Sequence, residues 1–223
     1  MRMHSDGRPG LVILDCDGVL VDSEHLLIDV RQEMLGELGI SISRADLIGR
    51  FVGTPHREFV AEVELLIGGP LPDTWDEDYQ RRCRLAFDIG LTPVPGILDA
   101  LDALTVPTCV ASSGSHDKMA HTLAITGLLS RFEGRIYSAT EVPRGKPYPD
   151  LFLHAAQAMG FAPGDCIVVE DSAAGVTAAL AAGMAVIAYA AGVTPKDQLE
   201  RPGVIVIDDM TVLPSAIEDA RRR

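Results

Sequence analysis

Two aspartates, Asp15 and Asp17, stand one residue apart at the end of an apolar run, and Gly18 behind them lets the backbone turn. In open α/β sheets, ligands bind beyond the carboxyl ends of the strands. Two acids without a neighbouring base are costly there unless a cation lies among them, and oxygen ligands suit Mg²⁺. The pair predicts a cation site, with aspartates at the corners of an ordinary turn as the simpler alternative.

Another apolar run ends in two further acids, Glu170 and Asp171. The small residues after Ser172 predict a helix that packs closely on the sheet and whose N-terminus faces the same rim. The two acids are therefore candidates for the same cation site. The simpler alternative is that Asp171 or Ser172 only caps the helix.

Hydroxyl groups follow a third apolar run, in the segment TCVASSGSHDK at 108–118. Ser112, Ser113 and Gly114 lie between a predicted strand and a predicted helix. Hydroxyls and free backbone N–H groups at a helix start form a cradle for phosphate. An ordinary loop with a serine cap is the alternative.

A single lysine, Lys146, lies in the segment RGKPYPD at 144–150. The prolines stiffen this loop, so the ammonium group is placed rather than mobile. The pattern predicts a cation that meets an anionic ligand, and a solvated surface lysine is the alternative.

These residues require a sheet that brings strand ends together. Six short runs are mostly continuously apolar, which is typical of strands buried on both faces of a parallel sheet. The runs are Leu11–Asp15, Thr108–Ser112, Arg135–Ser138, Cys166–Glu170, Ala185–Tyr189 and Val204–Ile207. Helical segments separate them, including one that Asp150 is expected to cap and Gly160 to end. The alternation predicts an α/β fold with a doubly wound parallel sheet.

One interval, from about Ser23 to Leu91, has helical periodicity and no convincing strand. Its apolar stripes are Leu26, Val30, Met34 and Leu38; Phe59, Val60, Val63, Leu66 and Ile67; and Tyr79, Cys83 and Phe87. We expect a core domain of residues 1–22 and 92–223 with a helical cap domain of residues 23–91 inserted in it. The hinges are expected at Asp22–His25 and Gly90–Pro95.

Composition limits the possible partners. The 223 residues are 47% hydrophobic and carry a net charge of −13, so the surface repels nucleic acid and anionic membranes. No signal peptide is visible, and no apolar run reaches about 18 residues. We expect a cytoplasmic protein without nucleic-acid or membrane partners, as a monomer or weak dimer.

Together, the four segments resemble the motifs of the haloacid dehalogenase-like phosphohydrolases, in the group with a helical cap after the first strand. The motifs match in order, from Leu11 to about Asp208. The resemblance implies that Asp15 is the nucleophile, that Asp17 is the general acid and base, and that Ser112 and Lys146 hold the phosphoryl group. It also implies that Mg²⁺ is bound by Asp15, Asp17, Glu170 and Asp171, with Asp17 contributing its carbonyl.

The family mechanism implies a magnesium-dependent phosphatase of a small phosphorylated metabolite, acting through an aspartyl phosphate. A sugar phosphate or similar phosphomonoester is the expected substrate. The pattern is more similar to 6-phosphogluconate and sugar-phosphate phosphatases than to others, and phosphoglycolate stays open.

The cap loop at 49–59 is expected to reach over the site and read the substrate. Gly53, His56 and Arg57 are the candidate contacts, and with Arg50 the two basic side chains can meet a second anionic group. A solvated basic turn is the alternative.

Two other functions stay open. A β-phosphoglucomutase shares the fold, but Leu27, Val52 and His56 stand where such mutases carry a histidine, a lysine and an arginine; Arg57 is one place along. A non-enzymatic sugar-phosphate-binding protein would not need both Asp15 and Asp17. A phosphonate hydrolase is disfavoured because residues 23–91 contain no lysine.

Overall fold

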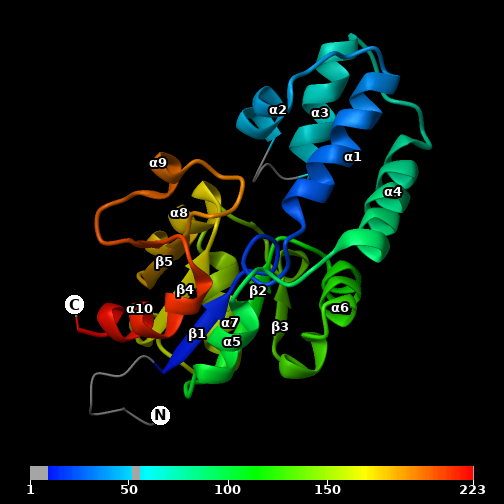
Figure 1. Ribbon diagram of the computed structural model, residues 1–223. Helices are drawn as coiled ribbons and strands as arrows, with labels where there is room; N and C mark the ends of the chain where they lie inside the picture. The colour runs from blue at the N-terminus through cyan, green and yellow to red at the C-terminus, as the bar shows by residue number, and fades with distance from the viewer. Residues whose placement is uncertain (1–9, 52–55, 223) are drawn as a thin grey trace.

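The computed structural model describes residues 10–51 and 56–222, and its centre is a six-stranded sheet (Figure 1). All pairings are parallel, in the order β3-β2-β1-β4-β5-β6. The strands are β1 Leu11–Leu14, β2 Thr108–Ser112, β3 Ile136–Ser138, β4 Cys166–Glu170, β5 Ala185–Tyr189 and β6 Ile205–Ile207. Each predicted run contains a strand, and three bounds differ by one residue.

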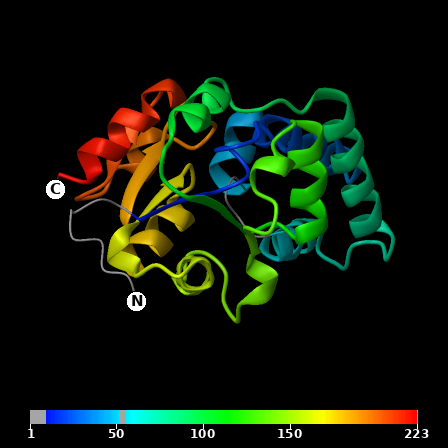
Figure 2. The same ribbon diagram turned by 90° about the horizontal axis from the view of Figure 1, so that it is seen from below.

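Helices cover both faces of this sheet (Figure 2). Alternate strand residues point to opposite faces, so Leu11 and Ile13 pack with α7 (Asp150–Met159) and α8 (Ala173–Ala181). Val12 and Leu14 belong to the core on the other face, with α5 (Ile97–Ala103), α6 (His116–Ile125) and α10 (Leu213–Ala220). The short helix α9 (Lys196–Leu199) precedes β6. The doubly wound α/β fold is confirmed.

The strand order reverses beside β1. The chain runs from β1 outward to β2 and β3, then returns to the opposite side of β1 as β4. Such a reversal opens a crevice at the carboxyl ends of the strands, where ligands bind in these folds. The crevice therefore lies where β1 and β4 deliver their acidic residues.

Four helices lie between β1 and α5 in the described residues, and Figure 1 shows them gathered away from the sheet. They are α1 Glu24–Glu37, α2 Arg44–Phe51, α3 His56–Ile67 and α4 Trp75–Gly90. None of the described residues from 24 to 90 forms a strand. None of the helices described is both long and apolar enough to cross a membrane.

The apolar stripes are only partly as expected. Tyr79, Cys83 and Phe87 are buried, but Leu66 is 42% exposed. In α1, Leu26 and Leu38 are only partly buried, because residues spaced every four drift around a helix with 3.6 residues per turn. The buried face of α1 consists of Leu27, Ile28, Val30, Arg31, Met34 and Leu35.

One predicted cap is wrong. Asp150 is the first residue of α7, whose N-cap is Pro149 without a side-chain hydrogen bond. The Asp150 carboxylate instead accepts from Arg144, at 3.2 Å. Gly160 ends α7 with φ 79°, as expected.

Candidate active site

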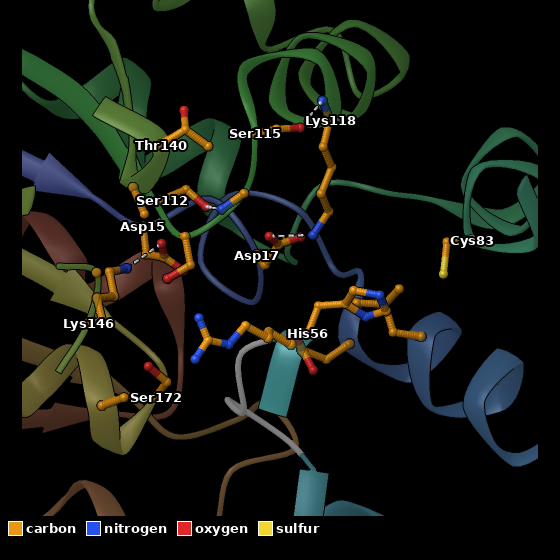
Figure 3. A pocket seen from close by; sticks show the side chains of 18 of the residues that line it. Asp15, Asp17, His56, Cys83, Ser112, Ser115, Lys118, Thr140, Lys146 and Ser172 are labelled. Atoms are coloured by element: carbon orange, nitrogen blue, oxygen red, sulfur yellow. Dashed lines mark hydrogen bonds and ion pairs between the residues drawn. The ribbon is translucent and has the colours of Figure 1, made fainter. Parts of the chain in front are cut away.

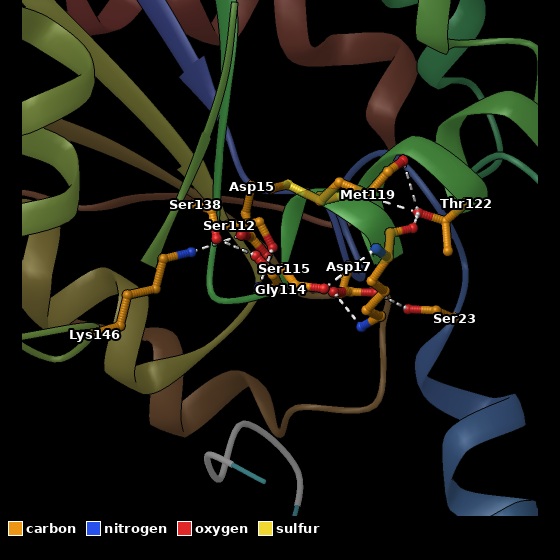
Figure 4. A network of polar contacts seen from close by, with 12 residues as sticks. Asp15, Asp17, Ser23, Ser112, Gly114, Ser115, Met119, Thr122, Ser138 and Lys146 are labelled. Carbon is orange, nitrogen blue, oxygen red and sulfur yellow. Dashed lines mark hydrogen bonds and ion pairs between the residues drawn. The ribbon is translucent and has the colours of Figure 1, made fainter. Parts of the chain in front are cut away.

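A lysine lies between two acids at the carboxyl ends of β1 and β4. The Lys146 Nζ donates to Asp15 Oδ1 at 2.6 Å (Figures 3 and 4) and to Glu170 Oε1 at 2.5 Å, and all three side chains are buried. Lys146 comes from the loop between β3 and α7, so three distant segments meet here. The solvated-lysine alternative is excluded by this burial.

Asp171 completes an acidic cluster with Asp15 and Glu170. One carboxylate oxygen from each residue lies within 4.8 Å of the others. Two glycines make this approach possible: a Cβ on Gly18 would lie 1.9 Å from Asp171 Oδ2, and one on Gly175 would lie 1.8 Å from Glu170 Oε1. Gly18 also has φ +75°, which side chains disfavour.

The pKa values of two acids in the cluster are raised. Burial raises the pKa of Asp15 to about 7, although the charge of Lys146 opposes the shift. Burial also raises the pKa of Asp171 well above its ordinary value, and the charges of Glu170 and Asp15 add to the effect. A bound cation would restore the ionised forms. The three carboxylates therefore fit an ion with oxygen ligands, such as Mg²⁺.

Glu170 is fixed more tightly than the other acids. Its Oε2 accepts from the backbone N–H groups of Asp171 and Ser172, at 2.9 and 2.8 Å, and from Ser172 Oγ at 2.9 Å. Ser172 also caps α8 by accepting from the Gly175 N–H at 3.0 Å, so it is the N-cap and Asp171 is not. Any cation at Glu170 must share Oε1 with Lys146.

The Asp17 side chain has different partners and is not part of the acidic cluster. It accepts from Ser23 Oγ at 2.6 Å (Figure 4) and from Lys118 Nζ at 2.7 Å (Figure 3). Burial raises the pKa of Asp17, but the Lys118 charge and the two hydrogen bonds outweigh it, so the pKa is lower than usual. Sequence reasoning missed both Ser23 and Lys118 as partners.

The serine loop after β2 borders the same site. Ser112 Oγ accepts from the Gly114 N–H at 3.1 Å, and Ser138 Oγ donates to the Gly114 carbonyl at 2.7 Å. Ser115 caps α6. The serine-cap alternative is therefore correct for Ser115, while Ser112, Ser113 and Gly114 line the cavity.

A cavity of about 1250 Å³ lies between these strand ends and the helices α1, α3 and α4. Asp15, Asp17, Ser112, Lys146 and Asp171 line its floor. From the helices, the lining includes Leu27, Arg31, His56, Arg57, Tyr79 and Arg84. The expected core residues, apart from the enclosed Glu170, thus share one cavity with two of the expected cap residues.

The cap residues are engaged in different ways. His56 contacts the Asp76 carboxylate through Nε2 and stacks on the Tyr79 ring at 4.7 Å, whereas Arg57 is exposed. Arg50 donates to Glu62. Gly53 and Val52 lie outside the described residues.

Comparison with known proteins gives the class to which this fold and site belong. The model of the haloacid dehalogenase-like hydrolases matches residues 9–183, so the chain belongs to that family. It is 34% identical over 204 residues to the 6-phosphogluconate phosphatase of Escherichia coli (strain K12), covering 91% of this chain and 92% of the relative. The family and this relative confirm the expectation of a phosphoric monoester hydrolase.

Two solved structures are similar over nearly their whole length. A haloacid dehalogenase-like protein of unknown function from Agrobacterium tumefaciens is 35% identical, with a TM-score of 0.84 and coverage of 94% of this chain and 98% of that one. A hydrolase of the family from Deinococcus radiodurans R1, with bound phosphate and sodium, is 30% identical, with a TM-score of 0.78 and coverage of 96% and 97%.

Proposed function

We propose that this protein is a magnesium-dependent phosphatase that hydrolyses a sugar phosphate or similar phosphomonoester through an aspartyl phosphate on Asp15. The observation that carries the proposal is the contact of Lys146 with Asp15 and Glu170, with Asp171 completing the acidic cluster. Mg²⁺ would be held by Asp15, Asp171, the Asp17 carbonyl and Glu170, and would offset charge on the phosphoryl oxygens.

Each residue at the strand ends has a step in this proposal. The Asp15 carboxylate attacks phosphorus, and the bond to the leaving oxygen breaks. Lys146 and the Ser112 hydroxyl bind phosphoryl oxygens, assisted by Ser113 and Gly114. Asp17 gives a proton to the leaving oxygen and then takes one from the attacking water, whose oxygen bonds to phosphorus as the bond to Asp15 breaks and inorganic phosphate leaves. The Lys118 and Ser23 contacts favour ionised Asp17, which is the form that the second step requires.

Residues 23–91 are proposed as the cap, hinged at Asp22–His25 and Gly90–Pro95, with Gly53, His56 and Arg57 facing the substrate. The 6-phosphogluconate phosphatase relative supports a phosphorylated sugar derivative, and the bound phosphate of the Deinococcus relative supports an anion at the strand ends. A cytoplasmic monomer or weak dimer stays our expectation from sequence.

Hydrolysis is favoured over transfer to a sugar hydroxyl. Leu27 lines the cavity where the resembling mutases carry a histidine, and a leucine relays no proton. His56, in the place of the mutase arginine, is paired with Asp76. With β-glucose 1-phosphate and catalytic glucose 1,6-bisphosphate, we expect inorganic phosphate and no accumulation of glucose 6-phosphate.

The metal requirement has two readouts. Phosphate release from a panel of sugar phosphates should need Mg²⁺, stop in excess EDTA and be inhibited by Ca²⁺, which takes more ligands. Separately, Mg²⁺ at 100 times its dissociation constant should stabilise the wild type by about 2.7 kcal/mol. Asp171→Asn should lose this stabilisation. Full activity in EDTA, or equal stabilisation of the variant, would contradict the proposed site.

A further inference from the structure

A buried arginine lies on the cap side of the cavity. Arg31, on α1, is 6% exposed and lines the cavity. Its Nε donates to Tyr79 Oη at 3.2 Å and its Nη1 to the Phe51 carbonyl at 2.8 Å. Its guanidinium lies 4.7 Å from the centre of the Phe59 ring. The three partners are neutral, and they fix the side chain in one position.

No carboxylate of the described residues forms a direct ion pair with Arg31; Glu24 of the same cavity interacts electrostatically with Arg31 without a hydrogen bond to it. Other arginines of the cavity differ: Arg81 is paired with Asp78 and Arg144 with Asp150. Arg57 and Arg84 are exposed, so water solvates their charges. A buried cation without a directly contacting counterion is costly unless an anion reaches it.

The guanidinium has capacity for such an anion. It carries five N–H donors, and two hydrogen bonds to the described residues use two of them. Arginine binds a carboxylate or a phosphate through parallel N–H···O bonds, so the three remaining donors suit either group. The cavity connects this position to Asp15 and Lys146.

We infer that Arg31 binds a second anionic group of the substrate, a carboxylate or phosphate at the end remote from the scissile phosphate. This inference rests on the proposed phosphatase function. Arg31 follows Ser23, the partner of Asp17, by eight residues, or about 12 Å along a helix. A side chain that leans toward the helix N-terminus shortens this span, yet a chain of several carbons is still required. A sugar acid phosphate therefore fits, and phosphoglycolate is too short.

The test compares two esters that differ at the remote end alone. 6-Phosphogluconate carries a carboxylate where glucitol 6-phosphate carries a hydroxymethyl group. With Mg²⁺ present, wild-type kcat/KM should favour 6-phosphogluconate by roughly 10- to 100-fold, the range of a charged hydrogen bond. Arg31→Gln should remove this preference by lowering kcat/KM for 6-phosphogluconate, with glucitol 6-phosphate changed less than about threefold. Arg31→Lys should regain part of it.

A matched control is Arg82→Gln, which removes an arginine of α4 that is paired outside the cavity. It should leave the preference unchanged. Glucose 1,6-bisphosphate tests whether the remote group is a phosphate. If the wild type has a higher kcat/KM for it than for 6-phosphogluconate, and Arg31→Gln loses that difference, the remote group is a second phosphate.

The outcomes separate the two claims. Absence of turnover with every ester overturns the phosphatase proposal. Turnover of all three esters with equal kcat/KM in the wild type, or equal losses in Arg31→Gln, overturns the role of Arg31. If Arg31→Gln does not fold, the wild-type comparison and Arg31→Lys decide.

Discussion

The two ends of the cavity differ in how their buried positive charges are paired. At the strand ends, Lys146 contacts Asp15 and Glu170, and Lys118 contacts Asp17. At the cap side, Arg31 is equally buried, but its contacts are a phenol, a carbonyl and a ring. The strand ends thus contain the acidic and basic groups that the hydrolysis of any phosphate ester requires. The cap side presents a charge that has no directly bonded acid among the described residues, and we infer that the substrate supplies one.

The largest effect should come from the strand ends. Asp15→Asn keeps the shape of the side chain but removes the nucleophile, so kcat should fall at least about 1000-fold. The fold should persist, and thermal stability should be unchanged or higher, because burial disfavours the Asp15 charge. Phosphate release and circular dichroism test this. More than a few per cent of wild-type activity would point to another nucleophile.

Lys146→Met should cost the most stability. It leaves two buried carboxylates, Asp15 and Glu170, without their shared cation, a loss of about 3–5 kcal/mol. Lys118→Met is the matched comparison, because Lys118 is partly exposed and forms an ion pair with one acid, Asp17, among the described residues. Urea unfolding without Mg²⁺ should rank Lys146→Met well below Lys118→Met. The reverse order would mean that Lys146 is not the main counterion.

The strand ends could be predicted from sequence because parallel strands that are buried on both faces have continuously apolar sequences. Once such runs alternate with helices, their carboxyl ends must share one rim, and polar residues there must meet. Lys146 and Asp15 are 131 residues apart and still touch for this reason. The bounds differed by one residue, as at Asp15, whose N–H still donates to the Val169 carbonyl at 3.0 Å although β1 ends at Leu14.

The cap side was harder to predict. The apolar stripe predicted for α1, with residues spaced every four from Leu26 to Leu38, does not include Arg31. The signal was nevertheless present, since Arg31 lies four residues from both Leu27 and Leu35, which are buried. Lys118 was quoted within a motif but not recognised as the partner of Asp17, because that contact depends on how α6 packs near β1. Contacts between the side chains of a helix and of a distant loop produce no periodic pattern in the sequence, so sequence periodicity does not predict them.

Smaller effects are expected at the exposed rim of the cap side. Arg57→Gln should lower kcat/KM for 6-phosphogluconate only about two- to threefold, because an exposed charge gains little from an ion pair. His56→Gln should act similarly by releasing Asp76 and the stack on Tyr79. Neither change should alter turnover of p-nitrophenyl phosphate, which lacks a second anion. Equal losses on both esters would place these residues in the chemistry rather than in substrate choice.

The smallest effect is expected for Arg82→Gln. This variant tests whether substrate choice depends on the net charge of the helical segment or on the buried position of Arg31. Arg82 binds Glu37 at 2.8 Å and Asp78 at 2.8 Å, linking α4 to α1, and both glutamates that it contacts, Glu33 and Glu37, are exposed. Surface pairs contribute about 0–1 kcal/mol and are screened by salt. Arg82→Gln should therefore lower the free energy of unfolding by at most about 1 kcal/mol, and less in 1 M NaCl than in 0.1 M. Catalysis of both 6-phosphogluconate and glucitol 6-phosphate should stay unchanged. A selective loss on 6-phosphogluconate would show that the net charge of the cap, rather than the buried position of Arg31, attracts the second anion.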